Sequence, residues 1–223
     1  MRSSSDIVSL LQKGYIGRME SSRLQQQLNF IIEIDKLKAV LRQTVLTDAS
    51  RQENSAEHSW HIALMAFVLA EYSADPQVDV FRVMKMLLIH DLVEIDCGDT
   101  FCYDEQRIVG KYERECEAAG RIFNLLPSDL SVEIRSLWEE FEDRKTPESK
   151  YANALDRLQP MLHNYHTEGH AWRMHGVTAD KVIERNRHIA DGAPALWDYA
   201  KAMIEDAVDK GYLLPTPTQS DAD

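Results

Sequence analysis

The segment of residues 85–99, "KMLLIHDLVEIDCGD", most constrains how this chain can fold. Its apolar residues leave almost no polar side to a helix, so the segment should be buried, yet it carries several ionisable side chains. These are His90, Asp91, Glu94, Asp96 and Asp99. Burying an ionised carboxylate costs several kcal/mol unless the group is paired, hydrogen-bonded or bound to metal. The segment therefore predicts a buried polar site whose charge is compensated by another group.

Helical periodicity extends over most of the chain, whereas strand signals are scarce. The clearest helical segments are residues 23–43, 56–73, 80–95 and 111–126. The sequence Thr146-Pro147-Glu148 supplies a cap, a proline at the first helical position and an early acid, and so predicts the start of a helix that contains Asp156. We therefore predict an all-α fold.

No strong break divides the helical segments from one another. We expect a single helical domain over residues 21–210, preceded by an N-terminal segment, 1–20, and followed by a partly disordered tail, 211–223. Two segments, at about residues 97–109 and 168–177, are predicted to be long irregular loops. Loops of that length are often functional.

The net charge of the chain excludes some classes of partner. A formal charge of −12 argues against a nucleic-acid polymer or an anionic membrane, because both attract positive protein surfaces. The three cysteines lack C-x-x-C spacing, so they suggest neither a disulfide framework nor a zinc–cysteine site. No stretch predicts a signal peptide or a membrane span. We expect a cytoplasmic protein with free thiols.

Three helical segments carry histidine or aspartate in apolar surroundings: His58 in the first, His90-Asp91 in the second, and Asp156 in the third. A single buried histidine is usually bonded to a backbone carbonyl, so none of these residues alone predicts a ligand. Together, two imidazoles and two carboxylates from three helices form a plausible mixed nitrogen and oxygen site. Such a site suits Mn, Fe, Co, Ni or Zn better than a thiolate-loving ion.

The order of these residues, H…HD…D, resembles the signature of the HD-domain metal-dependent phosphohydrolases. Two local segments, "RQENSAEHSWH" and "HDLVEIDCGD", resemble the branch that contains bacterial 5′-deoxynucleotidases and oxetanocin-phosphatase-like proteins. The similarity extends from about Leu24 to about Tyr165. By this resemblance a divalent ion, with Mg added to the candidates above, is held by four ligands. These are His58, His90, Asp91 and Asp156.

The resemblance also implies roles for residues around the metal. Glu94 is expected to be the catalytic acid that acts on the attacking water or the leaving group, with Asp99 as its helper near the ester oxygen. Arg42 is expected to contact the phosphate, and Arg51 to be a second basic residue near the site. Nucleotidases of this branch carry Arg-Trp where this chain has Arg42-Gln43. The aromatic side chain that packs on sugar and base is therefore missing, so we expect broad or shifted selectivity.

The residues and the resemblance together predict a divalent-metal-dependent phosphomonoester hydrolase acting on (deoxy)nucleoside 5′-monophosphates. Trp172 is expected to pack a surface loop, or to replace the missing aromatic if that loop closes over substrate. Two alternatives stay open: a phosphodiesterase or pyrophosphohydrolase of signalling nucleotides, and a non-catalytic binding module whose ion only staples helices. Glu94 and Asp99 favour an enzyme, because a staple needs no additional acids at the pocket. Related nucleotidases suggest a homodimer.

Overall fold

The computed structural model describes residues 22–103 and 109–217. The predicted N-terminal segment, 1–20, lies outside these ranges, as do residues 104–108 of the first expected loop and 218–223 of the tail. The described residues are mostly helical, with one two-stranded sheet, which confirms the predicted all-α fold. None of the described helices is long and apolar enough to cross a membrane.

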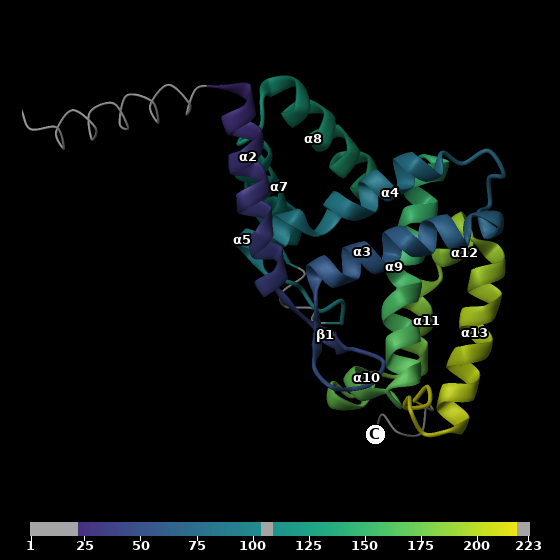
Figure 1. Cartoon of the computed structure of the whole chain (residues 1–223). Coiled ribbons are helices and arrows are strands. Elements are labelled where there is room, and N and C mark those ends of the chain that lie inside the picture. The colour runs from purple at the N-terminus through teal and green to yellow at the C-terminus, as the bar shows by residue number, and fades with distance from the viewer. Residues whose placement is uncertain (1–21, 104–108, 218–223) are drawn as a thin grey trace, which may run out of the picture.

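The elements follow one another along the chain as labelled in Figure 1. They are α2 (Arg23–Ile34), η1 (Asp35–Ala39), β1 (Leu41–Val45), β2 (Gln52–Asn54), α3 (Ser55–Val68), η2 (Ala70–Tyr72), α4 (Val80–Ile89), η3 (His90–Val93), α5 (Glu94–Cys97), α7 (Lys111–Phe123), α8 (Ser128–Asp143), α9 (Pro147–His166), α10 (His170–Met174), α11 (Ala179–Asn186), α12 (Ile189–Gly192) and α13 (Pro194–Asp209).

Helix α9 is the central element of the fold. It packs against α3, α4, α8, α12 and α13, and most of its residues are buried (Figure 1). The predicted start is confirmed: Thr146 caps the helix, its hydroxyl accepting a hydrogen bond from the Ser149 backbone, and Pro147 occupies the first turn. Because α9 is enclosed on several sides, a polar residue on it such as Asp156 is held inside the molecule.

The predicted continuous helix over residues 80–95 is wrong. Helix α4 ends at Ile89, residues His90–Val93 form the 3-10 turn η3, and the short helix α5 begins at Glu94. In a 3-10 turn the side chains at positions i and i+3 eclipse one another. The break therefore places the side chains of Asp91 and Glu94 on the same face. In an unbroken helix, His90 and Glu94 would share a face instead.

Two further features differ from the expectation. The antiparallel hairpin β1–β2 was not predicted; it carries Arg42 and leads directly into α3. The segment 168–177 is not an irregular loop, because it contains α10, and Trp172 is only 2% exposed. Gly169 precedes α10 and has a φ of 74°, a left-handed conformation that favours glycine. A Cβ at this position would lie 1.8 Å from the Tyr212 carbonyl oxygen, so only glycine fits.

Candidate active site

The four predicted metal ligands meet between α3, η3 and α9. His58 Nε2 lies 3.0 Å from Asp156 Oδ1 and 4.0 Å from Asp91 Oδ2. His90 Nε2 lies 3.0 Å from Asp91 Oδ1 and 3.6 Å from Asp156 Oδ1. All four residues are buried. His58 and Asp156 are 98 residues apart in the sequence, so their contact could not be read from the sequence directly.

A chain of hydrogen bonds orients the His58 ring and makes its Nδ1 a donor. The carboxylate of Glu53 only accepts, so the Gln159 amide nitrogen, 2.6 Å away, donates to it. Gln159 Oε1 then faces His58 Nδ1 at 3.0 Å and must accept from it. His58 Nε2 is thereby turned toward Asp156 Oδ1, 3.0 Å away, where a proton or a metal ion would link the two groups.

The imidazole ring of His90 is also oriented by a hydrogen bond from its Nδ1. This nitrogen lies 2.8 Å from the Leu87 carbonyl, to which it donates, and the buried Nε2 lies 3.0 Å from Asp91 Oδ1 without making a well-aligned hydrogen bond among the described residues. Asp91 and Asp156 outweigh the effect of burial and raise the pKa of His90 to about 9. This position therefore attracts positive charge: a proton in the free chain, or a divalent ion in its place.

The donor set fits a divalent metal. Ligand atoms about 2.0–2.2 Å from one ion are separated by roughly 3 Å or slightly more, which is the spacing found here. Burial would raise the pKa of Asp156, but Arg157, His58 and His90 hold it well below its usual range, so this carboxyl stays ionised. An ionised carboxylate and two oriented imidazoles form a preorganised cation site.

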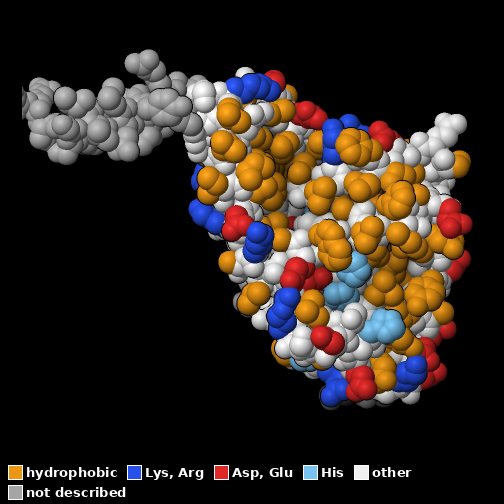
Figure 2. All heavy atoms as spheres, viewed as in Figure 1, with side chains coloured by type: hydrophobic (Ala, Val, Ile, Leu, Met, Phe, Trp, Pro, Cys, Tyr) orange, Lys and Arg blue, Asp and Glu red, His pale blue; other side chains and the backbone are white. Residues whose placement is uncertain are grey.

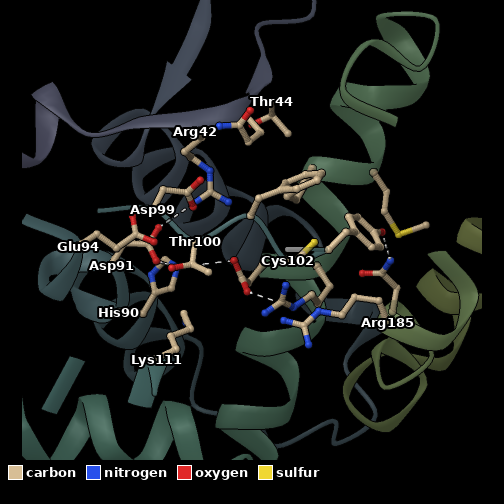
Figure 3. A pocket seen from close by; sticks show the side chains of 18 of the residues that line it. Arg42, Thr44, His90, Asp91, Glu94, Asp99, Thr100, Cys102, Lys111 and Arg185 are labelled. Carbon is tan, nitrogen blue, oxygen red and sulfur yellow. Dashed lines mark hydrogen bonds and ion pairs between the residues drawn. The ribbon is translucent and has the colours of Figure 1, made fainter. Parts of the chain in front are cut away.

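Glu94 and Asp99 lie beside the cluster, along the wall of the same cavity (Figure 3). The Ser55 hydroxyl donates to Glu94 Oε2 at 2.7 Å. Burial, Asp91 and Asp99 raise the pKa of Glu94 well above its usual range, which favours the protonated form of its carboxyl. Burial also raises the pKa of Asp99, although Arg42 opposes it.

The two predicted arginines are placed differently. Arg42, on β1, lies in the cavity with Nη1 2.9 Å from Asp91 Oδ2 and 3.9 Å from Asp99 Oδ1. Arg51 forms an ion pair with Glu57 at 2.6 Å, is 53% exposed and does not line the cavity. The expectation that Arg51 lies near the site is not supported by this placement.

Comparison with known proteins decides the family. The family described as "HD domain" matches residues 34–197. The chain belongs to the HD-domain family. Among curated relatives, 5′-deoxynucleotidase HDDC2 of Danio rerio is 30% identical over 195 residues, which cover 78% of this chain and 96% of the relative. The 5′-deoxynucleotidase of Yersinia pestis is 26% identical over 136 residues, 57% of this chain and 68% of the relative.

Solved structures agree with this assignment. A crystal structure of a protein named as a predicted metal-dependent phosphohydrolase, from Magnetospirillum magnetotacticum, is 56% identical and superposes with a TM-score of 0.84. It covers 87% of this chain, and the match covers 97% of that protein. A conserved hypothetical protein from Pyrococcus furiosus has a TM-score of 0.58 at 22% identity, over 82% of this chain and 99% of its own, and shares the HD fold.

Beyond the metal ligands, the HD-domain site includes groups that sequence reasoning missed. The cavity has a volume of about 330 Å³, and besides the acidic cluster it is lined by aromatic and basic side chains. They include Phe101, Tyr103, Arg144, Arg157 and Arg185, beside Trp172, which the sequence had already singled out. Glu53 and Gln159 were also missed. A sign of Gln159 was its position three residues after Asp156, on the same face of α9.

A second group of side chains with metal-ligand spacing forms a hydrogen-bond network instead. Glu53, His61 and His163 lie close enough to hold an ion, but the Gln159 amide nitrogen is the group at their centre. It lies 3.3 Å from His61 Nδ1 and 3.0 Å from His163 Nε2. His61 is therefore a neighbour of the site, and the network it joins supports the orientation of His58.

Proposed function

We propose that this HD-domain protein is a divalent-metal-dependent phosphomonoesterase that hydrolyses (deoxy)nucleoside 5′-monophosphates. The observation that carries the proposal is the convergence of two oriented imidazoles, two carboxylates and the buried carboxyl of Glu94 at one cavity. The relatives named 5′-deoxynucleotidase support the same substrate class. The acids Glu94 and Asp99 favour an enzyme over a module whose ion only staples helices.

In this proposal His58, His90, Asp91 and Asp156 hold the ion. A bound divalent ion lowers the pKa of its water and neutralises phosphate oxygens. Arg42 would donate hydrogen bonds from its guanidinium group to the phosphate. These contacts would stabilise the negative charge that develops on the phosphate oxygens in the transition state.

Glu94 supplies the proton in the proposed reaction. Its carboxyl, held by Ser55, gives a proton to the ester oxygen as the bond from phosphorus to that oxygen breaks. The nucleoside leaves as an alcohol, the water oxygen remains on the phosphate, and the proton that the water loses returns to Glu94. Burial, Asp91 and Asp99 favour the protonated form of that carboxyl.

The nucleoside would lie against the aromatic wall of the cavity. Gln43, which stands where related nucleotidases have tryptophan, accepts a contact from His175 Nε2 at 3.2 Å and offers no ring. Phe101 and Tyr103 line the same hollow as Gln43 and His175. Trp172 packs in the core at the base of the main cavity and belongs to no surface loop. Broad selectivity among bases is the expected result.

We also propose that the enzyme is a cytoplasmic homodimer whose HD domain spans residues 21–210. Free cysteines suit a reducing compartment. Large apolar side chains are exposed on one face of α3 and on α4, where Figure 2 has a broad apolar area. Trp60, Leu64 and Phe67 follow helical spacing along α3, a pattern typical of a helix packed on another protein surface. A second copy of the chain is the proposed occupant.

The experiment that tests the activity is a substrate panel with the purified protein under Mn²⁺, Co²⁺ and Mg²⁺. Ribo- and deoxynucleoside 5′-monophosphates are compared with cyclic nucleotides and nucleoside diphosphates, and released phosphate is measured. Hydrolysis of monophosphates that stops on chelation of the metal is the expected result. Turnover confined to cyclic or pyrophosphate substrates would contradict the proposal, and inactivity on every substrate with metal bound would favour the binding module.

A further inference from the structure

A cluster of three arginines lies in the cavity on the far side of Asp156 from the metal ligands. Arg144 ends α8, Arg157 follows Asp156 on α9, and Arg185 comes from α11. All three line the cavity that also holds Asp91 and Glu94. Figure 3 shows Arg185 and those two acids at opposite ends of that cavity.

These guanidinium groups have few partners among the described residues. The one ion pair found for the cluster there joins Arg157 Nε to Asp156 Oδ2, at 3.5 Å. Within the described part of the chain, the buried Nε atoms of Arg157 and Arg185 have no hydrogen-bond partner. Arg144 Nη1 has a long contact, 3.5 Å, with His188 Nε2, and Arg185 reaches the Cys102 thiol. Buried charges serving only the fold would be expected to have carboxylate partners.

The electrostatics of the cluster show that its acidic neighbours balance only part of its charge. Against the effect of burial, Asp156 raises the pKa of Arg157. The pKa values of Arg144 and Arg185 are lowered, although Glu142 and Asp156 oppose the shift at Arg144. Arg157, followed by burial, lowers the pKa of Arg185, and burial followed by Arg157 lowers that of Arg144. Burial and the three arginines together lower the pKa of His188 to about 4, so its imidazole is neutral. Like charges held together in this way destabilise the chain unless an anion lies between them.

Asp156 divides the cavity into two positions. Its Oδ1 faces His58 and His90, and its Oδ2 faces Arg157. Arg42 already serves the metal side, where it contacts Asp91. When one phosphate is bound at the metal, the guanidinium groups beyond Asp156 are therefore free to bind another anionic group. The planar guanidinium group donates two parallel hydrogen bonds, a geometry that matches the oxygens of a phosphate.

We propose that Arg144, Arg157 and Arg185 form a subsite for a second phosphate of the substrate. The preferred substrate is then a phosphomonoester that carries another phosphate elsewhere on the molecule, with one phosphate at the metal and one at the arginines. This inference rests on the proposed function for the first of the two positions.

The test compares 2′-deoxyadenosine 3′,5′-bisphosphate with 2′-deoxyadenosine 5′-monophosphate on the Mn²⁺-loaded enzyme. Wild type is expected to show at least a tenfold higher kcat/KM for the bisphosphate, mainly through KM. In the double variant R144Q/R185Q this ratio falls to within about threefold of one, because charge-assisted contacts to the second phosphate are removed. The matched control is R187Q, which removes an exposed arginine next to the same helix and keeps the wild-type ratio.

Three results would overturn the subsite. They are a ratio near one in wild type, an equal loss on both substrates in the double variant, and an unchanged ratio in that variant. Calorimetric binding of the same two ligands to Mn²⁺-loaded protein keeps the test independent of turnover. If neither ligand is hydrolysed, the proposed function fails, yet tighter binding of the bisphosphate that R144Q/R185Q abolishes still supports the subsite.

The single variant R185Q tests whether replacing the arginine impairs folding rather than phosphate binding. Because it relieves repulsion from Arg157, it is expected to unfold at a higher temperature than wild type in the absence of ligand. A lower unfolding temperature would assign Arg185 a structural role and contradict the subsite.

Discussion

Glu94 is the residue whose replacement separates proton transfer from metal binding. The substitution Glu94→Gln removes the proton that burial and the neighbouring acids retain on this carboxyl, but it keeps the side-chain shape and the acceptor for Ser55. We expect kcat to fall by about 10²–10⁴-fold while bound metal is unchanged. His90→Ala is the comparison, and it should lose the metal. Metal analysis and phosphate release measured together decide between the roles, and loss of metal from Glu94→Gln would make Glu94 a ligand.

Gln159 acts at the same scale by orienting a ligand. Its amide links Glu53 to His58 and so fixes the imidazole with Nε2 toward Asp156. Gln159→Leu removes that bond, and we expect affinity for Mn²⁺ to fall by about 10- to 100-fold, as is common for groups that support metal ligands. Lys150→Gln on the same helix serves as the control. Chelator competition measures the affinity, and an unchanged value in Gln159→Leu would mean that packing alone orients His58.

At the scale of elements, the sequence allowed the helical fold and the ligand set to be predicted, but not the turns that assemble them. His90-Asp91 in an apolar segment was readable, because burial makes a polar pair conspicuous. The 3-10 turn η3 was not, because α-helical and 3-10 spacing differ little over four residues. The arginine cluster was equally unreadable, since its members come from three helices and each alone resembles a surface residue.

In the proposed nucleotidase, base selectivity would be determined by the cavity wall formed by β1 and the segment after α5. Gln43 on β1 lies near Phe101 but contributes no ring. Gln43→Trp adds a stacking surface worth about 1–3 kcal/mol per base, so KM for deoxynucleoside 5′-monophosphates should fall roughly tenfold or more. Ribose 5-phosphate has no base to stack and is the control substrate. Equal changes in KM for both substrates would show that Gln43 affects only the phosphate end.

At the scale of the whole molecule, the apolar face of α3 predicts the assembly state. Trp60 and Phe67 are 63% and 67% exposed, and such large apolar groups side by side are expected to be covered by a second copy of the chain. We expect light scattering after gel filtration to give twice the 25.6 kDa mass of one chain. The double variant Trp60→Glu/Phe67→Glu should have the mass of one chain, because burying two carboxylates at an apolar interface costs more than the contact contributes. Val132→Glu changes an equally exposed residue on α8 and should leave the dimer intact. A wild type of single-chain mass, or a dimer that tolerates both glutamates, would remove this face from consideration as the interface.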